Sequence, residues 1–273
     1  MEGDGSIKVP CVVRSAKGKL QYPSITIVFA LKDLPLAQLL AKLLGGRVYQ
    51  QTGQYIMLSI QSLAGVYAFA VLVNGKIRTP KVEGLHRLIA WLNASGKFPF
   101  IEALPIDNSP LNTNAWLAGL LDSDSSFLIT FLLNISGQAY GVDLTMRLTQ
   151  RQEYHRSSSL GTSYLPIITT IAGMLGINVI KYTRDRGVRT ELGFLLRVKS
   201  LAARLLLINY LDNYQLLSSK RLDYLAWRTA HDIVCSKAYR TSEGTAQLLA
   251  LKNSINTKRT TFDWSHLDKY LES

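Results

Sequence analysis

Two acidic residues follow an apolar segment that has small residues at its middle. Asp122 and Asp124 come directly after residues 116–121, where Ala118 and Gly119 lie between larger apolar side chains. Small residues inside an apolar helix let a second backbone approach closely. Acids at the end of such a helix would be held near the acids of its partner, which is costly unless a cation lies between them. Because oxygen ligands suit Mg²⁺, the segment suggests a helix interface that ends in a metal site.

The beginning of the chain repeats the acidic part of this pattern. Residues 1–7 read M-E-G-D-G-S-I and residues 122–127 read D-S-D-S-S-F, so an acid, a small residue and a second acid occur in both. This self-similarity predicts two copies of one unit. The alternative for residues 116–127 alone is an ordinary core helix with solvated acids at its end.

These two segments carry a resemblance to a known family. Residues 117–125, L-A-G-L-L-D-S-D-S, resemble the signature of the LAGLIDADG homing endonucleases and group I intron maturases, and residues 2–5 resemble its last four letters. Residues 22–46, 74–93, 216–227 and 253–267 resemble the fungal mitochondrial branch. The resemblance implies an α+β fold of two pseudo-symmetric αββαββα-type repeats, each with a curved antiparallel sheet.

The resemblance also implies a metal site and its chemistry. Phosphodiester hydrolysis needs a nucleophilic water, a metal that neutralises charge on the phosphate, and help for the leaving oxygen. Asp4 and Asp124 match the family's metal-binding acids, so we expect them to bind Mg²⁺. Glu2 and Asp122 match the less critical first acid and could serve as capping groups instead.

Three further polar residues match catalytic positions of the family. Lys81 and Lys220 each precede an apolar helical segment, where the family's lysine points at the active site; the alternative is a plain surface lysine at a helix start. Gln150 matches a polar residue at the base of the second sheet. Leu31 is the expected equivalent in the first unit, and it cannot hold a water molecule.

The sheets of the family lie in the major groove of DNA, which is wide enough for a two-stranded ribbon. The expected DNA-binding residues, beside Gln150, are Lys8, Arg14, Lys17, Lys19, Gln21, Arg147, Lys181, Arg184, Arg186, Arg189 and Arg197. A solvated sheet face is the alternative interpretation of their alternation. The basic stretch 237–259 is either an extra nucleic-acid contact or a solvated helical tail.

Periodicity predicts how these residues are positioned. Apolar spacing of 3.6 residues predicts helices, and alternation predicts strands. The expected helices begin at Asp33 and at residues 62, 80, 165, 200 and 219, and the expected strands span 6–13, 22–29, 47–51, 54–60, 127–135, 139–150 and a hairpin over 179–198. The expected domains are 1–97, a Pro-containing linker 98–114, and 115–273.

Composition bounds the partner. The chain has 273 residues, 47% of them hydrophobic and 18% charged, which is typical of a folded protein. A net charge of +12 favours an anionic partner, nucleic acid or an acidic membrane surface. No apolar run reaches the ~18 residues of a membrane helix. Cys11, Cys235 and the four histidines have no metal-ligand spacing.

The resemblance therefore predicts a monomeric, site-specific endonuclease that makes double-strand breaks in DNA during intron homing and is encoded in a mitochondrion. The alternatives are an RNA maturase that assists splicing of its group I intron, and a degenerate member without cleavage activity. Both metal-binding acids are present, which favours cleavage, whereas Ser125 and Leu31 count against it.

The apolar half of the first signature is missing from the chain. Only its last residues, 1–4, precede the first expected strand, so the Ala118/Gly119 helix lacks its twin. We expect the chain to be a fragment of a longer reading frame, with the missing helix just upstream.

Overall fold

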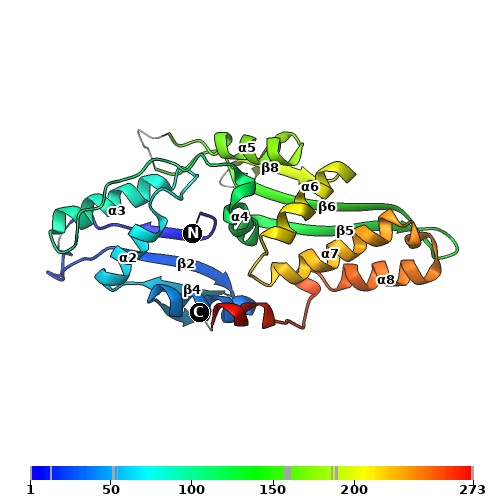
Figure 1. The fold of residues 1–273 in the computed structure, drawn as a ribbon, viewed down its shortest axis with the longest axis horizontal. Coiled ribbons are helices and arrows are strands. Elements are labelled where there is room, and N and C mark those ends of the chain that lie inside the picture. The colour runs from blue at the N-terminus through cyan, green and yellow to red at the C-terminus, as the bar shows by residue number, and fades with distance from the viewer. Residues whose placement is uncertain are drawn as a thin grey trace. The chain divides into compact units, whose positions relative to one another are not determined.

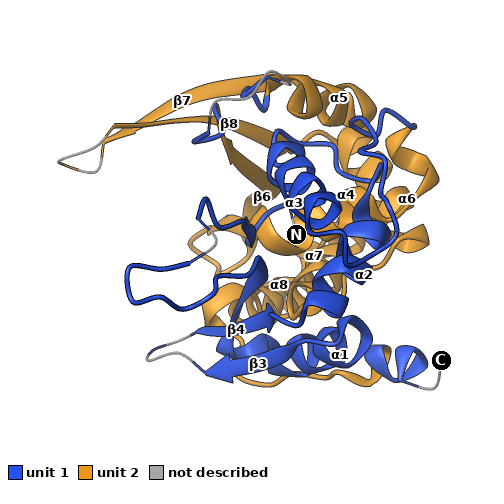
Figure 2. Cartoon of the chain, turned by 90° about the vertical axis from the view of Figure 1, so that its left-hand side faces the viewer, with its two compact units in different colours: residues 1–109, 153–164, 267–273 blue, residues 110–152, 165–266 orange. Residues whose placement is uncertain are grey.

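Alternating apolar residues build two four-stranded antiparallel sheets, one in each of two units (Figure 1). In the computed structural model the described residues are 2–12, 14–50, 53, 55–156, 161–185, 187 and 190–271. Unit 1 comprises residues 1–109, 153–164 and 267–273, and unit 2 comprises residues 110–152 and 165–266 (Figure 2). Two repeats with one antiparallel sheet each confirm the α+β class expected from the sequence.

Unit 1 has the strand order β1-β2-β4-β3, with helices on one face of the sheet. Its elements are β1 (Gly5–Lys8), β2 (Ser24–Ala30), α1 (Leu34–Leu44), β3 (Arg47–Gln50), β4 (Tyr55–Ile60), α2 (Leu63–Val73) and α3 (Val82–Ser95), with a 3-10 turn at Leu31–Asp33. The sheet buries Ile25 and Ile60 against Phe69, Leu85 and Leu88. This core holds β1, and with it the first acidic motif.

Local signals explain most of these boundaries. Strand β1 is shorter than the expected 6–13, because Pro10 has no N–H to offer a neighbouring strand. Asp33 occupies the N-cap of α1 without a side-chain capping bond, and Gly45 ends the helix at a φ of 64°, where glycine carries no steric cost. Ser62 caps α2 by accepting a hydrogen bond from Gly65 N at 3.2 Å.

Residues 98–109 are held on unit 1 by side-chain amides. The Asn74 side chain accepts from Leu104 N at 3.0 Å and donates to Glu102 O at 2.7 Å. Asn93 makes the same pair of bonds to the backbone of Ile101, at 3.0 and 2.8 Å. Each side-chain amide thus donates to a backbone C=O and accepts from a backbone N–H, as a neighbouring strand would. These bonds satisfy polar backbone groups of a segment that pairs with no strand.

Unit 2 has the strand order β5-β6-β8-β7. Its elements are α4 (Trp116–Asp124), β5 (Ser125–Leu133), β6 (Ala139–Arg151), α5 (Leu165–Leu175), β7 (Val179–Asp185), β8 (Thr190–Val198), α6 (Leu201–Asn213), α7 (Lys220–Cys235) and α8 (Ser242–Asn253), with 3-10 turns at Leu111–Thr113, Ala238–Arg240 and Asn256–Lys258. A further 3-10 turn, Ser265–Tyr270, begins in unit 2 and continues into the residues of unit 1. The core packs Phe127, Leu148 and Leu196 of the sheet with the fully buried Trp227 of α7. Among the described residues, no helix is long and apolar enough to cross a membrane.

The helix of the second motif is tied to α6. Tyr210 OH donates to Asn114 O at 2.9 Å and accepts from Ala118 N at 3.0 Å. The Asn114 side chain also accepts from Trp116 N at 3.0 Å, so two amides of the first turn of α4, those of Trp116 and Ala118, are satisfied by side chains. These contacts fix the position of the N-terminal turn of α4.

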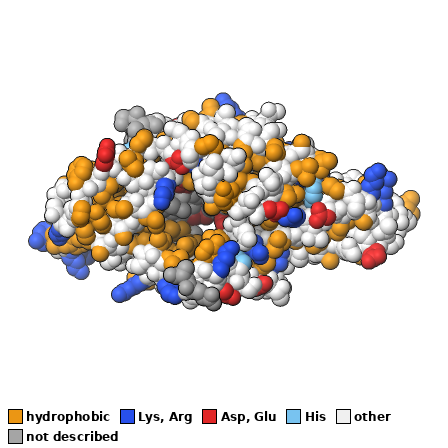
Figure 3. Space-filling model, in the orientation of Figure 1, with side chains coloured by type: hydrophobic (Ala, Val, Ile, Leu, Met, Phe, Trp, Pro, Cys, Tyr) orange, Lys and Arg blue, Asp and Glu red, His pale blue; other side chains and the backbone are white. Residues whose placement is uncertain are grey.

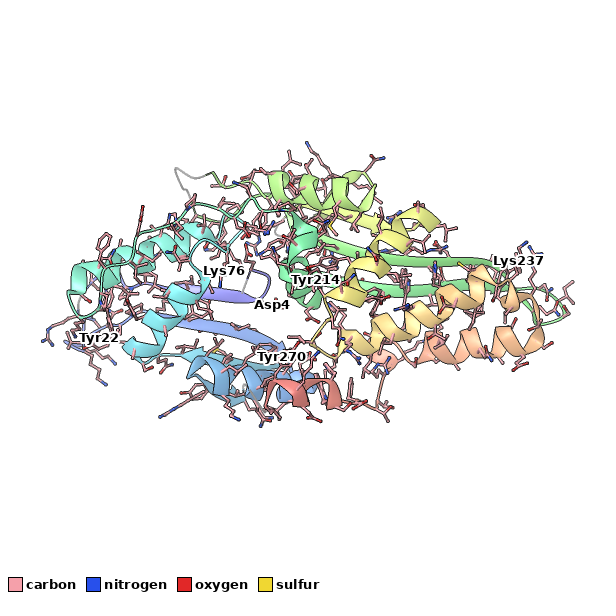
Figure 4. All side chains as sticks on the ribbon, in the orientation of Figure 1. Asp4, Tyr22, Lys76, Tyr214, Lys237 and Tyr270 are labelled. Atoms are coloured by element: carbon pink, nitrogen blue, oxygen red, sulfur yellow. The ribbon has the colours of Figure 1, made fainter. Side chains whose placement is uncertain are left out.

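The basic C-terminal stretch packs onto unit 2. Arg259 forms a buried ion pair with Asp223 of α7, with Nε 3.1 Å from Oδ1. Asn256 donates to the carbonyl of Phe127 at 2.8 Å, and Thr245 of α8 accepts from Ala139 N at 2.8 Å. Arg259 is thus used inside the protein, whereas Lys237 at the end of α7 is exposed (Figure 4).

Candidate functional site

The first acid of the unit 1 motif caps a turn. Glu2 Oε1 accepts hydrogen bonds from Arg78 N at 2.8 Å and from Thr79 N at 2.7 Å. These amides lie in the turn just before α3. Glu2 therefore ties the start of the chain to the last helix of its unit, which agrees with the capping function considered for it.

Asp122 does the same in unit 2. Its Oδ2 accepts from Leu217 N at 2.8 Å, and its Oδ1 accepts from Ser218 N at 3.1 Å and Ser218 Oγ at 2.6 Å. Burial raises the pKa of Asp122, although these hydrogen bonds and the charge of Lys220 oppose the rise. Asp122 therefore makes a structural contact with Leu217, which lies 95 residues further along the chain.

Lys81 holds the strand end that carries Asp4. Its Nζ donates to Gly5 O at 2.9 Å and also to Gly3 O. The two carbonyls flank Asp4, which is exposed and directly precedes β1 (Figure 4). The half-buried ammonium group is therefore placed beside the acid by backbone contacts.

Lys220 occupies the matching place in unit 2. Its Nζ lies 3.2 Å from both Leu121 O and Ser123 O. The last carbonyls of a helix have no partner within the helix, and they carry partial negative charge. Lys220 thus caps the C-terminal turn of α4, directly next to Asp124.

Asp124 is contacted by the residue expected at the base of the second sheet. The Gln150 side-chain amide donates to Asp124 Oδ2. Both residues are half-buried, and Gln150 lies opposite the buried Phe194 on the helix-covered face of the sheet. The structure therefore brings Asp124, Gln150 and Lys220 together at one end of unit 2.

Phe29, and not Leu31, matches Gln150 in unit 1. Gly5 and Ser125 each follow the second acid of their motif; Gly5 pairs with Ile27 of β2, and Ser125 pairs with Leu148 of β6. Two residues beyond these partners lie Phe29 in β2 and Gln150 in β6. Leu31 was the expected equivalent, but it lies in the 3-10 turn after the strand. Phe29 offers no hydrogen bond to Asp4, so the two units differ in the surroundings of their second acid.

Asp4 and Asp124 fit a hard cation by their chemistry. Each offers carboxylate oxygens, and Asp4 is exposed. Oxygen ligands and retained water are what Mg²⁺ prefers, and it is usually bound through one or two carboxylates. No cluster of three or more His, Cys, Asp or Glu residues that could hold a metal occurs among the described residues.

The open face of the unit 2 sheet carries arginines. Arg147 of β6 lies directly opposite Arg197 of β8, and both are exposed. Arg184 of β7 lies on the same face, opposite Glu191. Lys181 lies opposite Phe194 and therefore on the helix-covered face. It belongs to the edge strand β7, and its side chain is exposed. Arg186 and Arg189 lie outside the described residues.

The expected cations of unit 1 gather around one turn. Arg14 pairs with Leu20 in a small hairpin, and its guanidinium donates to Gly18 O at 2.7 Å. Lys17 and Lys19 are exposed in this turn, Gln21 follows it, and Lys8 lies at the end of β1. On the face seen in Figure 3, Lys and Arg side chains form separate groups over the molecule.

Pattern reading of the sequence missed three polar or aromatic residues on the open faces. Arg47 and Tyr49 on β3 and Arg151 at the end of β6 are all exposed. Arg47 lies opposite Ser59, on the face away from the helices. The expected strand 47–51 already implied that Arg47 and Tyr49 share one face, because side chains two residues apart in a strand point the same way.

Comparison with known proteins assigns the family. Residues 117–231 match the model of the LAGLIDADG endonucleases. The whole chain is 32% identical to an intron-encoded DNA endonuclease of Saccharomyces cerevisiae, of which it spans 72%. The chain belongs to the LAGLIDADG endonuclease family. It is also 29% identical, over 82% of its length, to an uncharacterised protein of the second cox1 intron of Schizosaccharomyces pombe, of which it spans 64%.

A solved member of the LAGLIDADG family has the same fold. The crystal structure of the I-SmaMI homing endonuclease bound to cleaved DNA matches with a TM-score of 0.69 at 19% identity, and the match covers 95% of both chains. At this identity the match concerns the fold alone. Each unit therefore has the fold of a LAGLIDADG repeat.

Proposed function

We propose that this chain is a site-specific endonuclease that cuts both strands of a double-stranded DNA target by Mg²⁺-dependent phosphodiester hydrolysis. The observation that carries the proposal is the constellation repeated in both units. In each, a second acid follows a capping acid, and a lysine at the start of a later helix binds backbone carbonyls near the second acid. A structural cap alone would not require a second acid at the same place twice.

In this proposal Asp4 and Asp124 are the metal ligands. When bound, Mg²⁺ neutralises charge on the scissile phosphate and lowers the pKa of a coordinated water. The Gln150 amide orients the Asp124 carboxylate through its hydrogen bond. Lys81 holds the backbone on both sides of Asp4, and Lys220 holds the turn that precedes Asp124. The positive charges of both lysines attract the phosphate.

The DNA contacts in this proposal come from the open sheet faces and the turn of unit 1. The residues are Lys8, Arg14, Lys17, Lys19, Gln21, Arg147, Arg184 and Arg197, together with Arg186 and Arg189 outside the described residues. Lys181, on the other face of the edge strand β7, contributes an exposed charge that attracts phosphates. Guanidinium groups suit guanine edges and phosphates alike. A relative from a cox1 intron supports intron homing in a mitochondrion as the setting.

Cleavage of the intron-insertion sequence tests the proposal. A supercoiled plasmid that carries the uninterrupted insertion site is incubated with the full chain and Mg²⁺, and conversion to linear DNA is followed. We expect the wild type to linearise the plasmid, and Asp4→Asn or Asp124→Asn to lose cleavage while both keep DNA binding in EDTA.

Asp268→Asn is the matched control, because Asp268 is exposed in the C-terminal tail and is not part of either motif. We expect it to cleave like the wild type. Binding of the site without cleavage by the wild type in Mg²⁺ would overturn the endonuclease, and rescue of intron splicing by such a protein would favour the maturase.

A further inference from the structure

Two arginines face each other at the centre of the unit 2 sheet. Ser126, Arg147 and Arg197 form one row across β5, β6 and β8, because Ser126 pairs with Arg147 and Arg147 with Arg197. Ser126 lies two residues after Asp124, so this row is the one next to the acid. Both arginines are exposed, and among the described residues neither guanidinium forms an ion pair.

The matching row of unit 1 has no charge at its centre. Ser6, two residues after Asp4, pairs with Thr26, and Thr26 pairs with Ser59. Ser59 is buried and accepts a hydrogen bond from Gln61 at 3.1 Å. The row ends in Arg47 on the edge strand β3. The same register thus places two arginines in unit 2 where unit 1 has two hydroxyl groups.

The next row does not separate the units in the same way. Unit 1 has Val28 opposite Met57, and unit 2 has Thr149 opposite Leu195, so both rows are uncharged. In the two rows nearest the acid, the contrast in charge between the sheets therefore lies at Arg147 and Arg197, whereas Arg151 and Arg184 lie further from it on the same face.

The arginine pair costs stability in the free protein. Like charges directly opposite each other on neighbouring strands are destabilising. A guanidinium group in the major groove binds guanine O6 and N7 with two hydrogen bonds, whereas Ser and Thr hydroxyls bond to any base edge without strong preference. Two arginines side by side therefore suit a guanine-containing, anionic ligand that separates and neutralises them.

We propose that Arg147 and Arg197 determine sequence specificity, so that the half of the target bound by unit 2 requires guanine while the matching positions of the other half tolerate base changes. This inference rests on the proposed function, since it takes double-stranded DNA as the ligand. It adds an unequal stringency of the two half-sites and names the residues that cause it.

Selection from randomised duplexes measures this inequality without cleavage. The full chain is incubated with a pool of random DNA duplexes in EDTA, and the bound fraction is sequenced. We expect one half-site with guanine enriched at one or two positions, and a second half-site with weak preference at the matching positions. Arg147→Gln and Arg197→Gln identify the half-site of unit 2, because only its guanine preference should disappear.

The variants separate base readout from phosphate contact. Loss of a two-pronged guanine contact weakens binding of the preferred site roughly 10- to 100-fold and removes discrimination at that position alone. Arg240→Gln is the matched control, since Arg240 is exposed and lies outside both sheets; we expect it to leave every base preference unchanged. Thermal melting of the free variants checks folding, and we expect no loss of stability in low salt.

The outcomes are distinct. Uniform weakening over all sequences would assign the pair to phosphates and overturn the inference. Specific binding with equal stringency in both halves would overturn it as well and leave the proposed endonuclease standing. No selective binding of duplex DNA would overturn both proposals together.

Discussion

At the scale of single residues, the two acids proposed to bind the metal, Asp4 and Asp124, differ in their neighbours. Asp124 accepts a hydrogen bond from Gln150, and the register places Phe29 at the corresponding position beside Asp4. A hydrogen bond to a carboxylate orients it and stabilises its charge. In the proposed enzyme the two acids therefore contribute unequally to cleavage of the two strands.

Gln150→Leu should slow cleavage of one strand more than the other. A hydrogen bond to a charged group contributes about 1.5–3 kcal/mol, which corresponds to roughly a 10- to 100-fold slower step. Duplexes labelled on either strand measure the two rates, with Gln247→Leu on the exposed side of α8 as the control. Equal slowing of cleavage of both strands would contradict this prediction. Phe29→Gln, which introduces an amide at the matching position of unit 1, is expected to speed cleavage of the strand that is cut more slowly.

Asp122 makes stability depend on pH. Burial raises its pKa in the folded state above the ordinary value of an aspartate, so above that ordinary value the folded protein binds the proton more tightly than the unfolded chain. Its contribution to the free energy of unfolding therefore falls as pH rises through that range. Asp122→Asn removes the dependence.

We expect the melting temperature of the wild type, relative to that of Asp122→Asn, to be higher near pH 4 than at pH 7. Differential scanning calorimetry of both proteins over this range measures the difference, in which all other titrating groups cancel. A difference that grows towards pH 7 would show that the hydrogen bonds from Leu217 and Ser218 outweigh burial.

At the scale of elements, capping and close backbone approach fix where the helices lie. Lys220 and Tyr210 hold the two ends of α4, and Thr241 caps α8 by accepting from Gly244 N at 3.0 Å. In α8 a Cβ added to Gly244 would lie 2.0 Å from Ala238 O. Backbone cannot move aside as a side chain does, so this glycine is required for α8 to lie against the turn at Ala238.

Gly244→Ala should therefore lower the free energy of unfolding by about 1–3 kcal/mol, through strain or undocking of α8. Gly173→Ala is the control, because it is also a helical glycine but its added Cβ meets nothing within 4 Å. Alanine there should be neutral or stabilise the protein by about 0.5–1 kcal/mol. Urea denaturation of the three proteins measures the effect, and equal stability of the two variants would refute it.

At the scale of the whole molecule, charge determines how the protein meets its partner. The net charge is +12, and among the described residues most of the expected cations lie on the open face of the unit 2 sheet and around the turn of unit 1. A partner with regularly spaced phosphates gains from such a distribution, because counterions are released as each phosphate is neutralised.

Binding of duplex DNA should weaken steeply with salt. For six to ten phosphate contacts, affinity falls on the order of a thousand-fold or more between about 50 and 200 mM salt. Fluorescence anisotropy with a labelled duplex measures the slope, and Arg147→Gln should reduce it by about one unit only if that residue contacts a phosphate. An affinity that is flat over this range would argue against nucleic acid as the partner.

The sequence by itself determined the family signature, the repeat and most of the elements, because these depend on local features. Helix 165–175 and the hairpin around residue 53 follow from apolar spacing and from glycine, which act within a few residues. The resemblance to the family, and not local periodicity, predicted the site residues Asp4, Asp124, Lys81, Lys220 and Gln150. Their roles in catalysis stay predictions.

Only the tertiary structure decided which residues face one another. Phe29 rather than Leu31 matches Gln150, and Arg147 lies opposite Arg197, because register is set by strand pairing between segments far apart in the chain. Glu2 caps amides 76 and 77 residues away, and Arg259 is neutralised by Asp223. Such contacts form when a distant partner replaces water, and no periodicity within either segment records which partner that is.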